Sequence, residues 1–255
     1  MRYLHLFFRL YSWVVKAVAD IHIPYKMRIF LFRTLGKHLF GMTESDFGLI
    51  NVPLSSFKTL NEFFTRQVDL KKRPIHFNEL ISPCEGKVIE YGLVKEGDRL
   101  IQAKGISYSL NRLVLSDKVS SNFKEGSFCN IYLSPRNYHR FHSPCSGTID
   151  YVQHICGACY PVNEAGQTIP GLYTLNERYI VSIVNPQFRI CLAIIGATAV
   201  RGIKLFKKEG DTLIKGEMLG MFQMGSSIIV LSSKKVFTAP NVPLGEVKVL
   251  GPILK

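Results

Sequence analysis

Two histidines three residues apart are the side chains best suited to proton transfer in this chain of 255 residues. His139 and His142 lie in the stretch 131–144, just after a predicted strand and a turn that contains proline. An imidazole gains and loses a proton near neutral pH, so the pair can serve as acid and base. The spacing alone also fits satisfied polar residues or a weak metal site, because a metal centre needs further placed ligands.

A Gly-Ser bond directly before a strongly β-forming run is the second candidate for chemistry. Gly225 has no Cβ, so the backbone can bend sharply and let the hydroxyl of Ser226 approach the preceding carbonyl carbon. With a base and an oxyanion donor nearby, an acyl shift becomes feasible at this bond. Gly-Ser is also a common turn, so the dipeptide alone leaves both interpretations open.

The N-terminal segments have the spacing of basic amphipathic helices. Helices are predicted over 2–19 and about 25–40, and Thr59 with Glu62 gives a capping pattern for a short helix over 57–66. The first 40 residues hold seven Lys or Arg and one Asp. The apolar face of such a helix either lies in the headgroup region of an anionic bilayer or packs on the protein's own core. In 2–19 that face is Leu4, Phe7, Phe8, Tyr11, Val14, Val15 and Val18, opposite Arg2, His5, Arg9, Ser12 and Lys16.

The remainder of the chain has the composition of β-strands. Short segments rich in β-branched or aromatic residues are separated by Gly, Pro, Asn or Asp, with one helical interruption at 107–115. The predicted strands are 87–93, 98–103, 127–133, 147–153, 178–184, 188–195 and 228–232. We therefore predict an α+β fold, with amphipathic N-terminal helices in a basic, membrane-associating region 1–66 and a mainly antiparallel β catalytic body over 67–255.

The net charge of +13 favours an anionic partner, which charge alone leaves as a nucleic acid, an acidic lipid surface or an anionic substrate. The chain lacks glycine-rich nucleotide loops and RNA-binding signatures, so no nucleic-acid partner is expected. Cys156 and Cys159 form one CxxC pair among six cysteines, for which reduced thiols and no metal are predicted. Charges at Arg9, Lys16 and Asp20 interrupt the first apolar stretch, which argues against a signal peptide and a membrane span.

Along most of its length the chain resembles the phosphatidylserine decarboxylase family, in the family's order of motifs. Any one of these blocks is weak evidence, whereas the ordered set is specific. The blocks are Leu60 to Arg66, Ser82 to Gly86, Lys104-Gly105 with Tyr108 to Leu110, Tyr132 to Pro144, Pro161 to Asn163, Asn176 to Arg178, Gly196 to Thr198, Lys215 to Glu217, and Met224 to Ser227.

The resemblance implies a proenzyme that cleaves itself between Gly225 and Ser226 into chains 1–225 and 226–255, which remain associated, with a dimer of these heterodimers as the family expectation. It implies that Ser226 becomes a covalent pyruvoyl group, the cofactor, which forms a Schiff base with phosphatidylserine and acts as an electron sink for loss of CO2. The substrate that the resemblance implies is an anionic lipid, which would account for the basic helices. We expect a peripheral protein on the cytoplasmic face of a bacterial membrane, bound to the anionic surface.

The family pattern also assigns roles to single residues. His142 matches the histidine of a self-cleaving Asp-His-Ser triad and is the base for Ser226, while His139 matches the histidine associated with decarboxylation. The triad's aspartate is Glu85 here, one methylene longer, which puts the rate of self-cleavage in question. The usual Leu-Gly-Ser-Thr has become Met224 to Ser227, a change that conserves volume and hydroxyl.

Three other functions fit parts of the sequence. One is a pyruvoyl decarboxylase of another amino acid or another serine lipid. A second is a relative that no longer processes itself because Glu85 fails, retained as a membrane-binding protein. The third, a lipoyl-like or biotinyl-like carrier at Lys215, is disfavoured because the neighbours of that lysine do not match a carrier hairpin.

Overall fold

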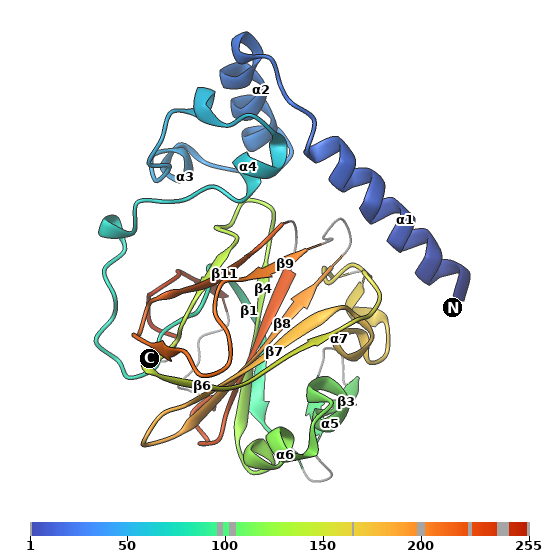
Figure 1. Cartoon of the computed structure of the whole chain (residues 1–255), viewed down its shortest axis with the longest axis vertical. Coiled ribbons are helices and arrows are strands. Elements are labelled where there is room, and N and C mark those ends of the chain that lie inside the picture. Colours follow the sequence, from blue (N-terminus) through green and yellow to red (C-terminus); the bar gives the residue numbers. More distant parts are fainter. Residues whose placement is uncertain are drawn as a thin grey trace.

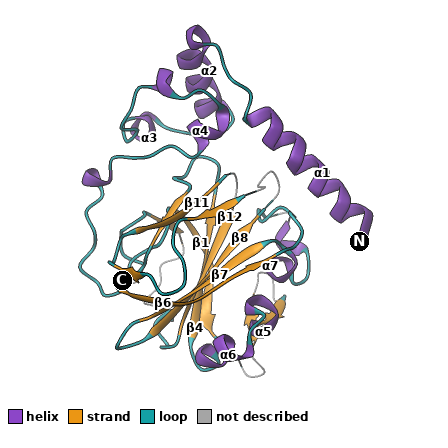
Figure 2. Cartoon of the chain, viewed as in Figure 1, coloured by secondary structure: helices purple, strands orange, loops and turns teal. Residues whose placement is uncertain are grey.

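A cluster of helices lies at one end of the molecule and a β-rich body at the other (Figures 1 and 2). The computed structural model describes residues 2–95, 99–101, 106–164, 166–197, 202–223, 226–238 and 245–253. Within these ranges the arrangement confirms the predicted α+β class, with N-terminal helices followed by a mainly antiparallel β body.

The helical end is built around a cluster of phenylalanine rings. Thr59 caps α4 as predicted, accepting a hydrogen bond from the Glu62 N–H at 3.1 Å, and α4 is shorter than the predicted 57–66. The rings of Phe32, Phe40, Phe57, Phe63 and Phe64 pack together. The elements are α1 (Arg2–Ala19), α2 (Tyr25–His38), α3 (Glu44–Phe47), η1 (Leu54–Ser56), α4 (Leu60–Phe64) and η2 (Leu70–Lys72).

Helix α1 contacts the protein through the face opposite to most of its large apolar side chains. Ser12 and Ala19 are buried and Val15 is half-buried against the phenylalanine cluster. The exposed apolar side chains of α1 are Phe7, Leu10, Tyr11, Trp13, Val14 and Val18. The alternative that the predicted apolar face packs on the protein's own core is therefore wrong for Phe7, Tyr11, Val14 and Val18. Among the described side chains of that face, it holds only for Val15.

The body is built on one large antiparallel sheet with the strand order β10-β6-β7-β8-β12-β4-β1-β13. Its long strands agree with the predicted segments, because continuous β-branched runs suit strands covered on both faces. The bounds are β1 (Gly86–Leu93), β4 (Ser127–Leu133), β6 (Gly147–Ile155), β7 (Arg178–Val184), β8 (Arg189–Gly196), β10 (Thr212–Leu213), β12 (Ser226–Ser232) and β13 (Gly245–Val247).

A second sheet covers one face of the large sheet and short helices cover the other (Figure 1). The small sheet has the order β5-β11-β9, formed by β5 (Arg140–His142), β11 (Met218–Phe222) and β9 (Ile203–Leu205). Phe141, Leu219 and Phe222 from it pack against Ile131, Ile194 and Ile228 of the large sheet. The other face is covered by α5 (Leu110–Val114), α6 (Asp117–Ser120), η3 (Ser121–Phe123), η4 (Gly166–Thr168) and α7 (Leu172–Leu175).

The helix predicted over 107–115 is partly wrong. Ser107–Ser109 forms strand β3, which pairs with β2 (Arg99–Ile101), and only α5 is helical. Ser109 ends the strand and caps α5, because its side chain accepts a hydrogen bond from the Arg112 N–H at 3.4 Å. Pairing with a neighbouring strand thus overrides the local helical pattern.

Candidate active site

Ser226 is the first residue of β12, the strand in the middle of the large sheet. It pairs with Leu133 of β4 on one side and with Gly196 of β8 on the other. Side chains alternate along a strand, so Ser226 faces the small sheet together with Ile228. Its hydroxyl is fully buried and has no hydrogen-bond partner among the described residues, whereas buried hydroxyls are normally paired. Gly225, the other half of the predicted cleavage bond, lies outside the described residues.

Both predicted histidines lie in or beside β5 of the small sheet, which covers the face of the large sheet toward which Ser226 points. His139 directly precedes β5 and its carbonyl accepts a hydrogen bond from the Phe222 N–H at 2.9 Å. Only three residues separate Phe222 from Ser226. The Cα atoms of Phe222 and Ser226 are therefore at most about 14 Å apart, which is the reach of an extended chain of this length. His142 ends β5, and its N–H donates to the carbonyl of Pro83 at 2.7 Å.

The ring of His142 has a defined tautomer. Its Nδ1 lies 2.8 Å from the carbonyl of Gly216 and must donate, because a carbonyl only accepts. Burial lowers the pKa of His142, so the ring is neutral at pH 7, with its lone pair on Nε2. That nitrogen lies 3.2 Å from the hydroxyl of Tyr138. His142 is thus a neutral base whose accepting nitrogen is set by a main-chain carbonyl.

His139 has the same tautomer in a drier environment. Its Nδ1 donates to the carbonyl of Asn137 at 2.8 Å, while Nε2 is buried without a hydrogen-bond partner among the described residues. The ring of Phe64 lies 4.0 Å away, centroid to centroid. Burial, followed by the charge of Arg66, lowers the pKa of His139 to about 3. His139 therefore stays neutral and presents an unused lone pair in the interior.

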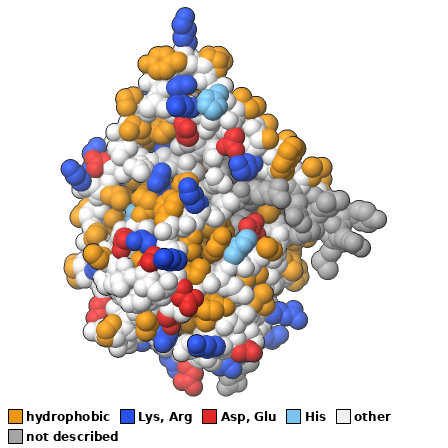
Figure 3. Space-filling model, viewed as in Figure 1, with side chains coloured by type: hydrophobic (Ala, Val, Ile, Leu, Met, Phe, Trp, Pro, Cys, Tyr) orange, Lys and Arg blue, Asp and Glu red, His pale blue; other side chains and the backbone are white. Residues whose placement is uncertain are grey.

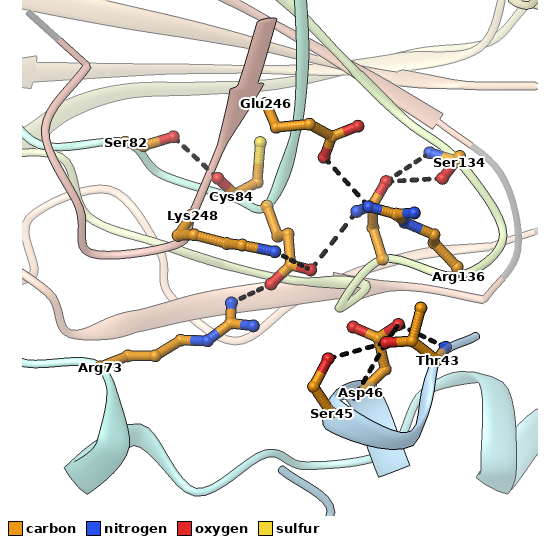
Figure 4. A network of polar contacts seen from close by, with 12 residues as sticks. Thr43, Ser45, Asp46, Arg73, Ser82, Cys84, Ser134, Arg136, Glu246 and Lys248 are labelled. Carbon is orange, nitrogen blue, oxygen red and sulfur yellow. Dashed lines mark hydrogen bonds and ion pairs between the residues drawn. The ribbon is translucent and has the colours of Figure 1, made fainter. Parts of the chain in front are cut away.

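Glu85 is buried at the start of β1, two residues after the carbonyl that pairs with His142. Its carboxylate forms an ion pair with Arg73, lies 3.5 Å from the Lys248 Nζ, and accepts from the Asn137 Nδ2 at 3.4 Å. Figure 4 shows Arg73 and Lys248 reaching into this corner from two different segments. Both ring nitrogens of His142 have other partners, so the predicted orienting role of Glu85 stays a prediction.

The sequence interpretation missed the cations around the site. Arg73 precedes Glu85 by 12 residues and Lys248 comes from the last segment of the chain, so no local spacing connects the three. Arg66 was visible as the last residue of the block that begins at Leu60, although nothing in that block linked it to His139. An arginine in a motif block that also holds an acidic residue, here Glu62, is the signal that could have pointed to it.

Segment 226–253 is held by the rest of the chain on many sides. β12 pairs along its whole length with β4 and β8, and β13 pairs with β1. Further on, the N–H of Leu250 donates to the carbonyl of Ser82 at 3.1 Å, and the N–H of Ser82 donates to the carbonyl of Gly251 at 2.9 Å. A break in the chain just before Ser226 would leave these contacts in place.

The chain is similar to known proteins over most of its length. A family model described as phosphatidylserine decarboxylase matches residues 60–252. A phosphatidylserine decarboxylase proenzyme of Vibrio parahaemolyticus is 38% identical over 204 residues, which cover 70% of this chain and 71% of that protein. One of Dechloromonas aromatica is 33% identical over 214 residues, with 76% and 74% covered. One of Alcanivorax borkumensis is 33% identical over 265 aligned residues, with 94% and 89% covered.

Proposed function

The chain belongs to the phosphatidylserine decarboxylase family and is a carboxy-lyase, and from this premise we propose that it makes phosphatidylethanolamine and CO2 from phosphatidylserine with a pyruvoyl group formed from its own Ser226. The observation that carries the proposal is the buried hydroxyl of Ser226 at the start of the central strand, which finds no hydrogen-bond partner in the described part of the chain. A structural serine in that position would be expected to find a hydrogen-bond partner.

In the proposed self-cleavage, His142 removes the proton of the Ser226 hydroxyl as its oxygen attacks the carbonyl of Gly225. The amide bond breaks as an ester forms, and the nitrogen becomes the free amine of Ser226. Elimination then releases the carboxylate of Gly225, and hydrolysis of the remaining dehydroalanine releases ammonia. The carbonyl of Gly216 supports this role because it keeps the Nδ1 proton in place and directs the lone pair to Nε2.

A pyruvoyl group at position 226 fits the surroundings of that residue. It would lie beneath the small sheet, where the hydroxyl of Ser226 and the Nε2 of His139 are both buried and have no partner among the residues that the structure describes. When present, it supplies a carbonyl that withdraws the electrons left behind by CO2. We assign His139 to proton handling at Nε2 during this step, because its burial excludes competing water.

In this proposal Glu85 supports His142 through its charge rather than through a hydrogen bond to the ring. Its buried carboxylate stabilises positive charge in the region, including the charge that His142 acquires when it takes the serine proton. Lys248 reaches Glu85 from the segment that becomes the second chain, so the ion pair spans the proposed break. Together with the paired strands, it supports association of 1–225 with 226–255 after cleavage.

The helical end supports binding to a membrane surface. Among the described residues, no helix is long and apolar enough to cross a bilayer. The apolar side chains that α1 leaves exposed form one face, and α2 adds Ile29 and the strongly exposed Phe30 beside Lys26, Arg33 and Lys37. Figure 3 shows hydrophobic and basic side chains interspersed over the helical end of the molecule. We propose that region 1–66 lies on the anionic cytoplasmic face of the membrane, where its cations attract the headgroups and its apolar face enters the interface.

The function is tested by incubating the purified chain with vesicles that contain phosphatidylserine and by measuring released CO2 and new ethanolamine lipid together. We expect both products in equal amounts from the wild type and neither from Ser226→Ala. Free serine in place of the lipid tests the alternative substrate class. Release of CO2 from serine but not from the lipid would contradict the proposed substrate.

A further inference from the structure

A pocket of about 310 Å³ lies between residues of the helical end and Arg140 of the small sheet, the residue that follows His139. Its lining includes the side chains of Asn51, Ser56, Glu62, Arg66, Gln67 and Arg140. The guanidinium groups of Arg66 and Arg140 thus line a space large enough for a small polar headgroup, with Glu62 elsewhere on its wall. None of the proposed catalytic steps uses this pocket.

The two arginines are held by main-chain carbonyls rather than by acids. Arg66 is buried and donates from Nη2 to the carbonyl of Arg136 at 2.6 Å, and its Nε is buried without a partner. Arg140 is half-buried and donates from Nε to the carbonyl of Thr65 at 3.0 Å. Within the described ranges neither guanidinium forms an ion pair with a carboxylate.

The nearby acids do not neutralise this pair. Burial lowers the pKa of Arg66 to about 10, and the charge of Asp46 offsets only part of this shift. The carboxylate of Asp46 accepts from the N–H of Thr43 at 2.8 Å. Glu62 is exposed, and its carboxylate accepts from the N–H of Lys58 at 2.6 Å. Two fixed, partly desolvated cations without acidic partners are the usual setting for binding a phosphate group.

Contacts connect the lining of the pocket with His139 on one side and with α2 on the other. Arg66 and His139 act on each other directly, because the charge of Arg66 lowers the pKa of His139 and the two share the carbonyl of Asn137 as an acceptor. On the other side, Ser56 lines the pocket, and Arg28 of α2 donates to the carbonyl of Ser55 at 3.0 Å. The lining of the pocket therefore lies between α2 and the surroundings of His139.

We infer that Arg66 and Arg140 bind the phosphodiester of the lipid substrate, and so hold its amino-acid headgroup beside His139 and residue 226. The inference rests on the proposed function and adds the part of the site that recognises a phospholipid rather than a free amino acid. The phosphodiester of the lipid lies a few bonds from the reacting amine. This short separation matches a phosphate site at Arg140, the residue next to His139. Arg140 is the better probe because Arg66 is buried and holds the backbone of 136–137.

The test is titration of the full chain with glycerophosphoglycerol, a soluble phosphodiester that has no amine and cannot react with a pyruvoyl group. We expect saturable binding by the wild type, at least about 10-fold weaker binding by Arg140→Gln, and partial retention by Arg140→Lys, since a charge-assisted contact is lost or weakened. Arg112→Gln is the matched control, because Arg112 lines a separate polar hollow of about 500 Å³ with Arg99. Its binding should equal that of the wild type.

Activity gives an independent readout. In processed Arg140→Gln we expect KM for phosphatidylserine vesicles to rise about 10-fold, with a smaller change in kcat, because the contact binds the substrate rather than the reacting atoms. Equal binding by Arg140→Gln and the wild type, loss in Arg112→Gln instead, or binding of inorganic phosphate without the diester would each overturn the inference. The titration needs no cleavage or decarboxylation, so failure of the proposed function would be seen separately.

Discussion

Helix α1 and strand β12 depart from the usual rule of burial in opposite directions. In α1, large apolar side chains such as Phe7 and Val18 are exposed, while Ser12 is buried. In β12, Ser226 and Ser227 are fully buried and their hydroxyls have no hydrogen-bond partner among the described residues. Both arrangements cost free energy in an isolated protein. Under the proposed function, each region is shaped for something outside the folded chain itself, a lipid surface in the case of α1 and a chemical reaction in the case of β12.

The largest expected effect is at the base that serves β12. Replacing His142 by alanine should slow self-cleavage by about 100-fold or more, because removal of a general base typically costs that much. The conversion is followed as the loss of the 255-residue chain on a denaturing gel. His154→Ala is the control, since His154 lies on β6 and pairs with Glu177. Cleavage at the normal rate in His142→Ala would remove His142 from the mechanism.

The buried corner beside the active site should be next in size. Arg73→Ala leaves the carboxylate of Glu85 with the half-exposed Lys248 as its cation beside the neutral amide of Asn137, and should lower the free energy of unfolding by about 3 kcal/mol. Urea unfolding in the uncleaved Ser226→Ala background measures it on a single chain. The matched change Arg189→Ala, in a more exposed ion pair with Asp150, should cost less than about 1 kcal/mol. Equal losses in the two variants would show that burial of Glu85 has no special weight.

Lowering the pH should destabilise the folded protein, because His139 and His142 are buried in their neutral form. The pKa of His139 is about 3 in the folded protein and that of His142 is also lowered, whereas both are near 6.5 when unfolded. The unfolded chain therefore binds more protons below pH 6.5, and stability should fall by up to about 1.4 kcal/mol per pH unit for each histidine. His139→Gln in the Ser226→Ala background should flatten this slope between pH 6 and 4. An unchanged slope would contradict the burial of neutral His139.

The smallest effect separates two neighbouring residues of α1. Val18 is 57% exposed and Ala19 only 2%. Val18→Glu should weaken binding to anionic vesicles by about 5-fold to 10-fold and leave the unfolding midpoint unchanged, because it removes apolar surface and adds a negative charge at the membrane. Ala19→Glu should instead destabilise the helical end by forcing a charge into the core. Sedimentation with vesicles and thermal unfolding distinguish the two. Unchanged vesicle binding by Val18→Glu would contradict a membrane role for this face.

The elements that the sequence predicted well are those with a strong local pattern. The helical spacing of 2–19 became α1, and the β-branched run at 228–232 became most of β12. The pattern did not reveal β5, β9 and β11, because a three-residue strand or one interrupted by Gly220 carries too little periodicity. Those strands bring His139 and His142 to β12, so the sequence named the histidines without showing what holds them.

The partners of the predicted site residues were harder to foresee. A main-chain carbonyl, that of Gly216, fixes the tautomer of His142, and no side-chain pattern encodes it. Glu85 was chosen for its place in a motif, yet its carboxylate is held by Arg73 and Lys248 from distant parts of the chain. The inward face of α1 could not be predicted either, because burial of Ser12 depends on tertiary packing.

The central claim, that Ser226 becomes the reactive group, is tested most directly by intact masses of the denatured wild type and of Ser226→Ala. We predict two wild-type fragments divided between Gly225 and Ser226, with a pyruvoyl-blocked N-terminus on the smaller one, and a single uncut mass for the variant. A single unmodified mass for the wild type, even after long incubation with anionic vesicles, would contradict the account.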